Sequence, residues 1–390
     1  MSEAYILSSI RTPIGRAPKG SLRATRPDDL GALAITAALE RAGVDKAAVE
    51  DVILGCAMPE AEQGLNVARI AALRAQLPVE ASAATVNRFC ASGIEAIAIA
   101  SQRAAAGATV IVAGGAESMS MVPIVGNNPS ANPWLMNHHP ESYLSMGLTA
   151  ERVAEKYHIT REAADAFALQ SHEKAIAAQD AGRFQEELIP VETRVPDETA
   201  ADYWRRVRLE RDEGPRRDTS PAALAALKPV FHAHGVVTAG NSSQTSDGAA
   251  AAVVVSGDYL HAHALTPVAR LAAYATAGVD PALMGIGPVR AVPMALRRAG
   301  LRLEDIDLIE LNEAFAAQAL AVIQALRMDP SKVNVNGGAV ALGHPLGCTG
   351  AKLLATITHE LRRRRARWGL VTMCVGGGQG AAAVIENLVL

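Results

Sequence analysis

The stretch AATVNRFCASGIEAIAIASQRAAAGATVIVAGG, from Ala83 to Gly115, decides the fold class. It begins with a short apolar strand, continues as a helix of small residues over 94–106, and returns as an apolar strand over 109–113. A glycine closes the helix and paired glycines stop the second strand, which is the turn chemistry expected at such ends. Strand, helix and strand in close succession predict an α/β protein.

The chain before this stretch follows the same plan. Residues 4–9 form a short apolar strand, and Asp28 or Asp29 can cap the helix that follows. A buried strand is expected over 52–54 and a helix over 66–75. This alternation extends the α/β pattern to the beginning of the sequence.

The C-terminal third repeats features of the beginning of the chain. Three pairs of segments correspond: Arg41-Ala42-Gly43-Val44 with Arg298-Ala299-Gly300-Leu301, Val86-Asn87 with Val333-Asn334, and the glycine-ended strand 110–113 with the glycine-ended strand 370–373. The interval is far longer than a solenoid repeat, so two packed copies of one α/β unit are favoured over an array. Chance similarity between short apolar strands is the alternative.

Between the two copies lies a stretch of different character, from about residue 118 to 245. It carries several prolines, predicted helices over 151–157 and 161–181, and then a charge-rich run. Six arginines stand close together in that run: Arg205, Arg206, Arg208, Arg211, Arg216 and Arg217. Such a run is either a solvated face or a phosphate-binding patch on an inserted loop domain. Interleaved acidic residues leave both interpretations open.

Length and charge narrow the class of protein. A chain of 390 residues is too long for one compact core, so two or three domains are expected. The net charge of −3 gives no global basic field that would recruit nucleic acid or an anionic membrane. The longest apolar runs are too short for a membrane span, and no secretory signal or peroxisomal address is recognised. We therefore expect a soluble, cytoplasmic protein.

The chain has four cysteines. Disulfides are not expected in a long chain without a recognised signal sequence, and no pair has the C-x-x-C spacing of a zinc site. Cys90 lies where a strand turns into a helix. A thiol at a helix N-terminus is near the positive end of the helix dipole and near free N–H groups, and both favour the nucleophilic thiolate. The small residues after it leave room for an acyl group. The alternative is a buried cysteine that serves packing alone.

Three further motifs contain candidate polar groups. His344 stands between glycine and proline in GHPLG, a turn that either points the ring into a cavity or simply hydrogen-bonds it. Cys374 opens the run CVGGGQG, whose glycines allow a ligand close to backbone N–H groups, although the run has no lysine and no following helix as a P-loop would. Asn312 begins NEAFA, where it serves a site or caps the next helix.

Together and in this order, these motifs resemble the thiolase family, and the resemblance covers essentially the whole chain. It includes the segments around Cys90, Asn312, His344 and Cys374 with each functional residue intact. It also includes four shorter segments: RTPIG at 11–15, AGGAESMS at 113–120, TAGNSS at 238–243 and SDGAA at 246–250.

The resemblance implies an α/β thiolase fold, in which two similar βαβαβαββ domains form a five-layer α-β-α-β-α stack. Each domain is expected to contain a mixed five-stranded sheet. A loop domain inserted in the first half, here about 119–245, covers the coenzyme A. The N-terminal domain is expected over 1–270, since the chain returns to the first sheet after the insert, and the C-terminal domain over 271–390.

The resemblance also implies roles for the motif residues. Cys90 attacks the 3-oxo carbon of a 3-oxoacyl-CoA and keeps the acyl group after carbon–carbon cleavage. Cys374 protonates the departing acetyl-CoA enolate and then deprotonates incoming coenzyme A. His344 activates Cys90 and shares one oxyanion site with a water held by Asn312. The backbone N–H groups of Cys90 and Gly376 form the other oxyanion site.

Substrate contacts follow from the same resemblance. Arg216 and Ser243 match positions that contact coenzyme A, and Met146 matches one that lines the acyl pocket. Coenzyme A is then a co-substrate, with no metal and no tightly bound cofactor. Cys56 and Cys348 match no catalytic position and are expected to pack. A homodimer or homotetramer is implied, and some degradative members also bind a hydratase/dehydrogenase partner.

The segments around Cys90 and over 134–148 look like the degradative branch, which serves fatty-acid β-oxidation. Ser145 stands where the biosynthetic branch usually has a histidine, which argues against restriction to acetoacetyl-CoA. The alternatives are a biosynthetic acetoacetyl-CoA thiolase and, in another class, a non-catalytic lipid- or coenzyme A-binding protein. A decarboxylating ketosynthase would not need Cys374. Steroid side-chain and ketoadipyl substrates stay open.

Overall fold

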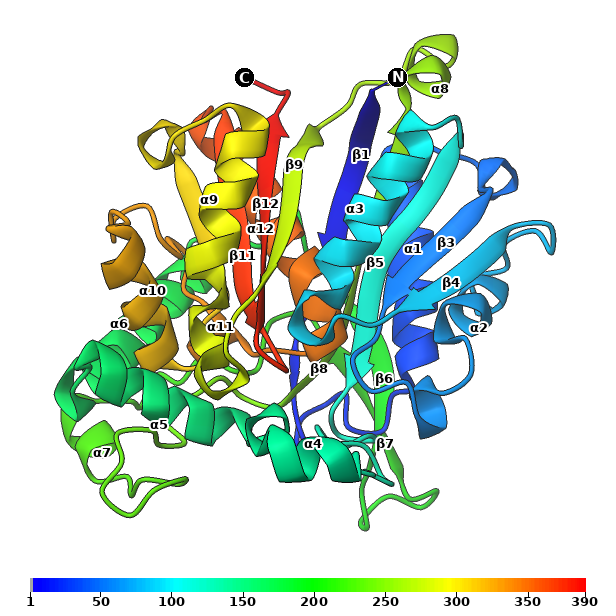
Figure 1. Ribbon diagram of the computed structural model, residues 1–390. Helices are drawn as coiled ribbons and strands as arrows, with labels where there is room; N and C mark the ends of the chain where they lie inside the picture. Colours follow the sequence, from blue (N-terminus) through cyan, green and yellow to red (C-terminus); the bar gives the residue numbers. More distant parts are fainter. Residues whose placement is uncertain (1–2) are drawn as a thin grey trace.

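The computed structural model describes residues 3–390, and Figure 1 shows a layered α/β molecule. The strands are β1 (Ala4–Arg11), β2 (Gly15–Arg16), β3 (Asp51–Gly55), β4 (Ser82–Val86), β5 (Val110–Ser118), β6 (Val191–Pro196), β7 (Trp204–Leu209), β8 (Ser246–Ser256), β9 (Ala269–Gly278), β10 (Leu308–Leu311), β11 (Trp368–Val375) and β12 (Gln379–Asn387). The helices are α1 (Pro27–Ala42), α2 (Val67–Arg74), α3 (Ser92–Ala105), α4 (Pro133–His138), α5 (Met146–Tyr157), α6 (Arg161–Asp180), α7 (Pro221–Ala225), α8 (Gly257–Ala262), α9 (Gly287–Ala299), α10 (Ala316–Leu326), α11 (Ala339–Leu342) and α12 (Leu346–Arg364).

The main strands form two sets that follow the same order. The first is β4-β3-β5-β8-β1, with the short β2 beside β8, and the second is β10-β11-β12-β9. Their directions also match: β3 and β10 run parallel to β5 and β11, whereas β8 and β12 run antiparallel to both neighbours. One pair, Ile6 with Ala269, joins the sets at β1 and β9. The α/β fold with two similar units, predicted from the sequence, is confirmed.

The second set has one strand fewer than the five predicted. Where β4 pairs with β3, the second half has an isolated parallel bridge between Ile309 and Val333. The next residue, Asn334, has a φ of 46°, which ends the extended conformation. Its side chain bonds to both backbone polar groups of Leu311 instead. The segment therefore lies beside β10 without forming a ladder.

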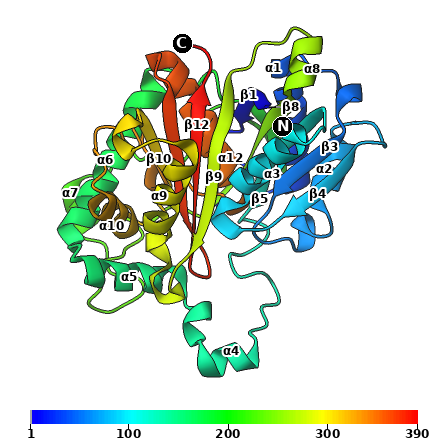
Figure 2. The ribbon, with the colours of Figure 1, turned by 45° about the horizontal axis from the view of Figure 1, so that its top comes forward.

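Helices divide the molecule into five layers. α1 and α2 cover the outer face of the first set of strands, and α9 and α10 cover the outer face of the second (Figures 1 and 2). α3 and α12 fill the space between the two sets. α12 is buried along most of its length because both sets contact it, and its buried residues include Lys352 and Glu360.

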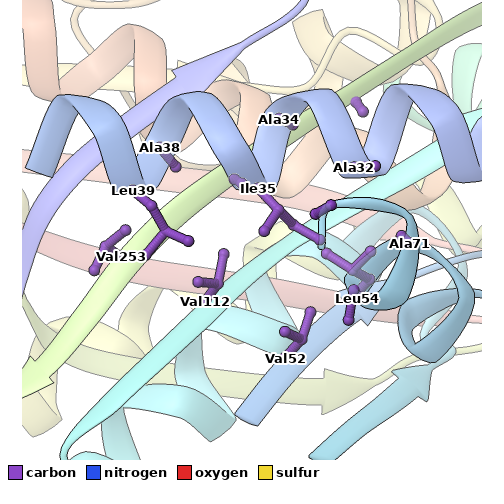
Figure 3. Close-up of a cluster of buried hydrophobic side chains, with 14 of the residues drawn as sticks. Ala32, Ala34, Ile35, Ala38, Leu39, Val52, Leu54, Ala71, Val112 and Val253 are labelled. Carbon is purple, nitrogen blue, oxygen red and sulfur yellow. The ribbon is translucent and has the colours of Figure 1, made fainter. Parts of the chain in front are cut away.

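Alternate residues of β5 face the two sides of the sheet. Val112 points to the outer layer, where Ile35 and Leu39 of α1 pack over it (Figure 3). Ile111 and Ala113 point to the central helices. Burial on both faces explains why this strand reads as a continuous apolar run.

The central helices approach closely because glycine and alanine line their contact. A Cβ atom added to Gly93 would lie 2.8 Å from the backbone nitrogen of Ala351, and one added to Gly115 would lie 2.0 Å from the carbonyl oxygen of Gly347. Only small residues fit where α3, α12 and β5 meet. A chain with 4% aromatic residues can therefore still build a tightly packed core.

The inserted stretch holds α4 to α7 and the β6–β7 hairpin, between β5 and β8.

Two predicted boundaries in the first half of the chain, the end of β5 and the start of α1, are wrong. β5 continues through its paired glycines to Ser118, because Gly114 lets β8 approach: a Cβ there would lie 2.0 Å from the carbonyl oxygen of Ala250. α1 begins at Pro27, so neither Asp28 nor Asp29 caps it. The domain limits at 270 and 271 stay a prediction.

None of the helices within residues 3–390 combines the length and apolar character that a membrane crossing requires.

Candidate active site

Cys90 lies in a single 3₁₀ turn, Phe89–Ala91, between β4 and α3. Phe89 has a φ of 43°, a left-handed conformation that is unfavourable for an aromatic residue. Side chains of the same segment hold it there: Phe89 N donates to Asn87 Oδ1 (2.8 Å), and Ser92 Oγ donates to the Phe89 carbonyl (2.6 Å). Local sequence thus fixes the thiol at the start of α3.

Cys90 is 1% exposed, and burial raises the pKa of its thiol to about 12. The backbone N–H groups of Gly376 and of Cys90 itself lower the pKa of the thiol and so oppose this rise, whereas the charge of Glu117 adds to it. The backbone N–H groups at the helix N-terminus favour the thiolate, as predicted, but burial outweighs them. Cys90 rests as a thiol and needs a base.

His344 is a base held in one tautomer. Its Nδ1 lies 2.6 Å from Thr349 Oγ1, and that hydroxyl donates its own hydrogen to the Pro345 carbonyl (2.9 Å). The Thr349 oxygen therefore accepts from Nδ1–H, which leaves a lone pair on Nε2. Burial, and then the charge of Lys352, lower the pKa of His344 to about 3, so the ring is neutral near pH 7.

Asn312 follows β10 and faces His344. Its Nδ2 lies 3.3 Å from His344 Nε2, and its Oδ1 is buried without a hydrogen-bond partner among residues 3–390. The next helix, α10, begins at Ala316 with Phe315 before it, so the alternative of Asn312 as a helix cap is wrong. A buried carbonyl oxygen that lacks a partner can accept a hydrogen bond from water or from a group of the substrate.

Cys374 lies near the end of β11, fully buried. Burial, and then the charge of Cys90, raise the pKa of its thiol, so the two sulfurs lie close enough to influence each other. Cys374 packs against Met284 and Ala314, with Met146 beside them. The second thiol therefore packs in an apolar cluster close to the first.

Gly376 and Met146 border the same space. A Cβ atom added to Gly376 would lie 3.3 Å from the ring of Phe89 and 3.8 Å from Met146 Cε. The absence of a side chain lets the backbone N–H of Gly376 reach the Cys90 sulfur. Met146 is the first residue of α5, whose N-cap is Ser145. Four separate elements thus bring their residues together here.

Arg216 lines a cavity of about 150 Å³ with Leu224, Leu227 and Gly240. Its guanidinium is exposed and makes no ion pair with the rest of the described chain (residues 3–390). Three of the other predicted arginines do pair with acidic residues, namely Arg205, Arg208 and Arg217. The solvated interpretation fits those three, whereas Arg216 keeps a free cation beside a cavity.

Ser243 lies next to Gln244, which lines this cavity, and is bonded to a neighbour of Cys374. Its backbone nitrogen donates to the Ala314 carbonyl (2.9 Å), and Ala314 packs against Cys374. Cys56 and Cys348 are both buried. Cys56 lies 3.8 Å from a Glu117 oxygen, and Cys348 packs among the central apolar residues.

Two residues near the site were missed by sequence reasoning. His172 is buried on α6, lines the same cavity as Arg216, and accepts a hydrogen bond from the backbone nitrogen of Arg216 (3.1 Å). Glu117 accepts from the backbone nitrogens of Ala57 and Gly347, both at 2.7 Å, and so ties the end of β3 to the start of α12. Their partners are distant in sequence, so no local motif indicates either role.

The sequence of the whole chain is similar to those of known proteins. The chain matches the models of the thiolase N-terminal domain over residues 4–258 and of the thiolase C-terminal domain over 265–387. A 3-ketoacyl-CoA thiolase of Bacillus subtilis is 51% identical to it, over 99% of this chain and 100% of that protein.

Two solved structures also match over nearly the whole chain. The acetyl-CoA acetyltransferase of Bacillus anthracis has a TM-score of 0.90 and 40% identity, and covers 100% of this chain and 99% of its own. Human mitochondrial 3-ketoacyl-CoA thiolase has a TM-score of 0.90 and 40% identity, with 99% of each chain covered. Fold and relatives define the class of protein as an acyltransferase. More narrowly, the chain belongs to the thiolase family.

Proposed function

We propose that this thiolase cleaves 3-oxoacyl-CoA with coenzyme A, giving acetyl-CoA and an acyl-CoA shortened by two carbons. One observation carries the proposal: two buried thiols, Cys90 just before α3 and Cys374 near the end of β11, lie close enough for the charge of Cys90 to raise the pKa of Cys374. A neutral histidine, whose Nε2 lone pair lies 3.3 Å from Asn312 Nδ2, completes the set. This arrangement supports acyl transfer through a cysteine.

In the first half-reaction His344 Nε2 takes the proton of Cys90, and the sulfur attacks the 3-oxo carbon. Negative charge develops on that carbonyl oxygen, where the N–H groups of Cys90 and Gly376 are available as donors. The bond between carbons 2 and 3 then breaks, and its electron pair leaves with the acetyl-CoA enolate. Cys374 gives its proton to that carbanion, which releases acetyl-CoA and leaves acyl-Cys90.

The second half-reaction restores both cysteines. The Cys374 thiolate takes the proton of incoming coenzyme A, and the coenzyme A sulfur attacks acyl-Cys90. The acyl group leaves as acyl-CoA, and the Cys90 sulfur takes a proton back from His344. Asn312, with its free Oδ1, supports a water that stabilises the thioester oxygen of the enolate. The proton balance closes without any group beyond these residues.

Coenzyme A is proposed as a co-substrate, without a tightly bound cofactor. The exposed Arg216 guanidinium is suited to a phosphate, the cavity beside it to an adenosine group, and Ser243 to the pantetheine arm that reaches the thiols. Met146, which borders Gly376 and packs with Cys374, is proposed to line the acyl pocket.

Among thiolase substrates, we favour long-chain 3-oxoacyl-CoA of fatty-acid β-oxidation. Ser145, which stands where the biosynthetic branch usually has a histidine, and the name of the Bacillus subtilis relative support this choice. The name of the Bacillus anthracis structure, acetyl-CoA acetyltransferase, supports the alternative of biosynthetic condensation. We further propose a homodimer or homotetramer in the cytoplasm, an optional hydratase/dehydrogenase partner, and domains over 1–270 and 271–390.

Thiolysis of 3-oxoacyl-CoA of increasing chain length tests this assignment. The degradative proposal expects activity on long chains at least comparable to that on acetoacetyl-CoA. Activity restricted to acetoacetyl-CoA would move the protein to the biosynthetic branch. Absence of activity with retained coenzyme A binding would support the non-catalytic alternative.

A further inference from the structure

A second cavity lies between β1 and the C-terminal half of α12. Its volume is about 320 Å³, and its lining includes Ser9 of β1 and Thr358 and His359 of α12. Residue 359 lies 13 positions after the start of α12, which places it roughly 20 Å along the helix from the end that follows His344. This cavity is therefore separate from the thiol site.

The strand geometry creates this space. β1 and β9 pair only at Ile6 and Ala269, and beyond that pair the two sets of strands separate. β1 also has a bulge between Ile6 and Ser8, where Leu7 has no register partner on β8. Bulges re-aim the side chains that follow them. Ser8 then bonds to the Ala38 carbonyl on the outer side, and Ser9 lies on the side of α12.

Three buried polar atoms at this cavity have no hydrogen-bond partner among residues 3–390. They are Ser9 Oγ, Thr358 Oγ1 and His359 Nδ1. Ser9 is 3% exposed and Thr358 is 4% exposed, so bulk water does not satisfy their hydroxyls. Such groups are rare because each one forfeits the hydrogen bonds it would make in water. Three around one cavity indicate a polar occupant.

The charges at the rim select the kind of occupant. Arg41 and Arg362 line the cavity, against one carboxylate, Glu186. Arg41 donates to the backbone carbonyl of Glu186, and the Glu186 carboxylate lies 3.7 Å from both Arg362 and His359, too far for a hydrogen bond. Two cations against one largely exposed carboxylate favour an anion.

The tautomer of His359 adds a chemical restriction. Its Nε2 lies 3.0 Å from the Ser9 carbonyl, which only accepts, so Nε2 carries the hydrogen and a neutral ring has a bare lone pair on Nδ1. The cavity therefore offers donors from two hydroxyls and two guanidiniums, together with two acceptors, His359 Nδ1 and the Glu186 carboxylate. A phosphate that retains one proton matches this set, because its oxygens accept and its P–OH donates. Fully deprotonated sulfate matches only the donors.

We propose that this cavity is a binding site for a small phosphate-bearing anion, distinct from the coenzyme A site. Its volume admits inorganic phosphate with water or a small phosphomonoester, and falls at the lower end of ligand pockets. The proposal is independent of the thiolase reaction, since it uses none of the residues assigned to it.

The test is calorimetric titration of the full-length Cys90→Ala protein with inorganic phosphate, glycerol phosphate and sulfate near pH 7. Phosphate should bind at least tenfold more tightly than sulfate. Binding of both phosphates identifies the phosphate group as the ligand, and binding of one alone identifies the source. Absence of binding by both phosphates, or equal affinity for sulfate, would overturn the proposal.

A double variant, Ser9→Ala with Thr358→Val, removes two donors while preserving the shape of the site. Because each hydrogen bond to an anion is worth about tenfold in affinity, phosphate should bind this variant roughly a hundredfold more weakly. Arg297→Ala removes an exposed arginine from α9 and should leave phosphate affinity unchanged. Unchanged affinity in the double variant would contradict the site.

Thermal unfolding provides a second readout. Without phosphate, Thr358→Val should melt no lower than the parent, because the hydroxyl that it removes has no partner. With phosphate, the parent should gain stability and the double variant should not. A lower melting temperature for Thr358→Val in phosphate-free buffer would show that the hydroxyl is already satisfied and would refute the argument.

Discussion

The two halves of the molecule share one topology but differ in what stands at the ends of equivalent strands. In the first half, the ends of β3 and β5 carry Cys56 and Glu117, and Glu117 accepts hydrogen bonds from backbone N–H groups. In the second half, the ends of β10 and β11 carry Asn312 and Cys374, which face the site. Equivalent positions thus serve structure in one copy and, in our proposal, chemistry in the other.

The central helices repeat this division. α3 follows Cys90 and α12 follows His344, so each copy presents a reactive side chain before a buried helix. The first copy supplies a thiol, whose pKa burial raises, and the second a histidine, whose pKa burial lowers. Both groups are neutral at rest. Duplicated backbones can therefore place a proton donor and a proton acceptor at matching sites.

The largest expected effect separates the site cysteines from the structural ones. Cys90→Ala and Cys374→Ala should each lower the rate of thiolysis by on the order of 10⁴-fold, because each removes a group that forms or transfers bonds. Cys56→Ala is the matched control at a strand end of the first copy and should remain within about threefold of the parent. A large loss of thiolysis in Cys56→Ala would contradict the distinction between site and structural cysteines.

The next effect concerns His344. His344→Ala should lower kcat/KM by about 10²- to 10⁴-fold at pH 7. The deficit should shrink as pH rises, because the Cys90 thiol, with its pKa raised to about 12, ionises without a base at high pH. In the parent, the His344 pKa of about 3 means that kcat/KM should not fall as pH decreases through 6.5. An acidic limb near pH 6.5 would count against a neutral resting histidine.

Much of this could be predicted from the sequence. The strand–helix alternation, the duplication and the segments around Cys90, His344 and Cys374 are local patterns, and local patterns survive folding. The ionisation of Cys90 could not be predicted, because it depends on burial by distant elements. The hydrogen bonds by which Glu117 joins β3 to α12 also depend on long-range contacts. The pairing of Asn312 with His344 is expected from the family resemblance, although no local pattern indicates it.

A smaller effect distinguishes Glu117, which stabilises the fold, from Asn312, which serves the reaction. Glu117→Gln replaces an acceptor oxygen by an amide that faces backbone N–H groups, so the free energy of unfolding should fall by about 1–3 kcal/mol. Asn312→Ala should instead lower activity with little loss of stability, since its Oδ1 has no partner to lose. Urea unfolding and thiolysis assays on both variants provide the comparison. Equal stability losses would remove the distinction between the two strand ends.

The smallest effect concerns the insert. Arg216→Ala should raise KM for coenzyme A roughly fivefold with kcat nearly unchanged, because the exposed guanidinium contributes binding alone. Arg217→Ala is its neighbour and control, since Arg217 is paired with Asp180 and should not affect KM. Similar effects of the two variants would assign both to a general charge on this face.

The most direct test of the two-cysteine account is mass spectrometry of the protein mixed with a 3-oxoacyl-CoA in the absence of free coenzyme A. If both cysteines act as proposed, Cys90 should carry one acyl group per chain and acetyl-CoA should be released. Addition of coenzyme A should then remove the acyl group. Attachment of the acyl group to Cys374, or acetyl-CoA release without any covalent adduct, would contradict the two-cysteine account.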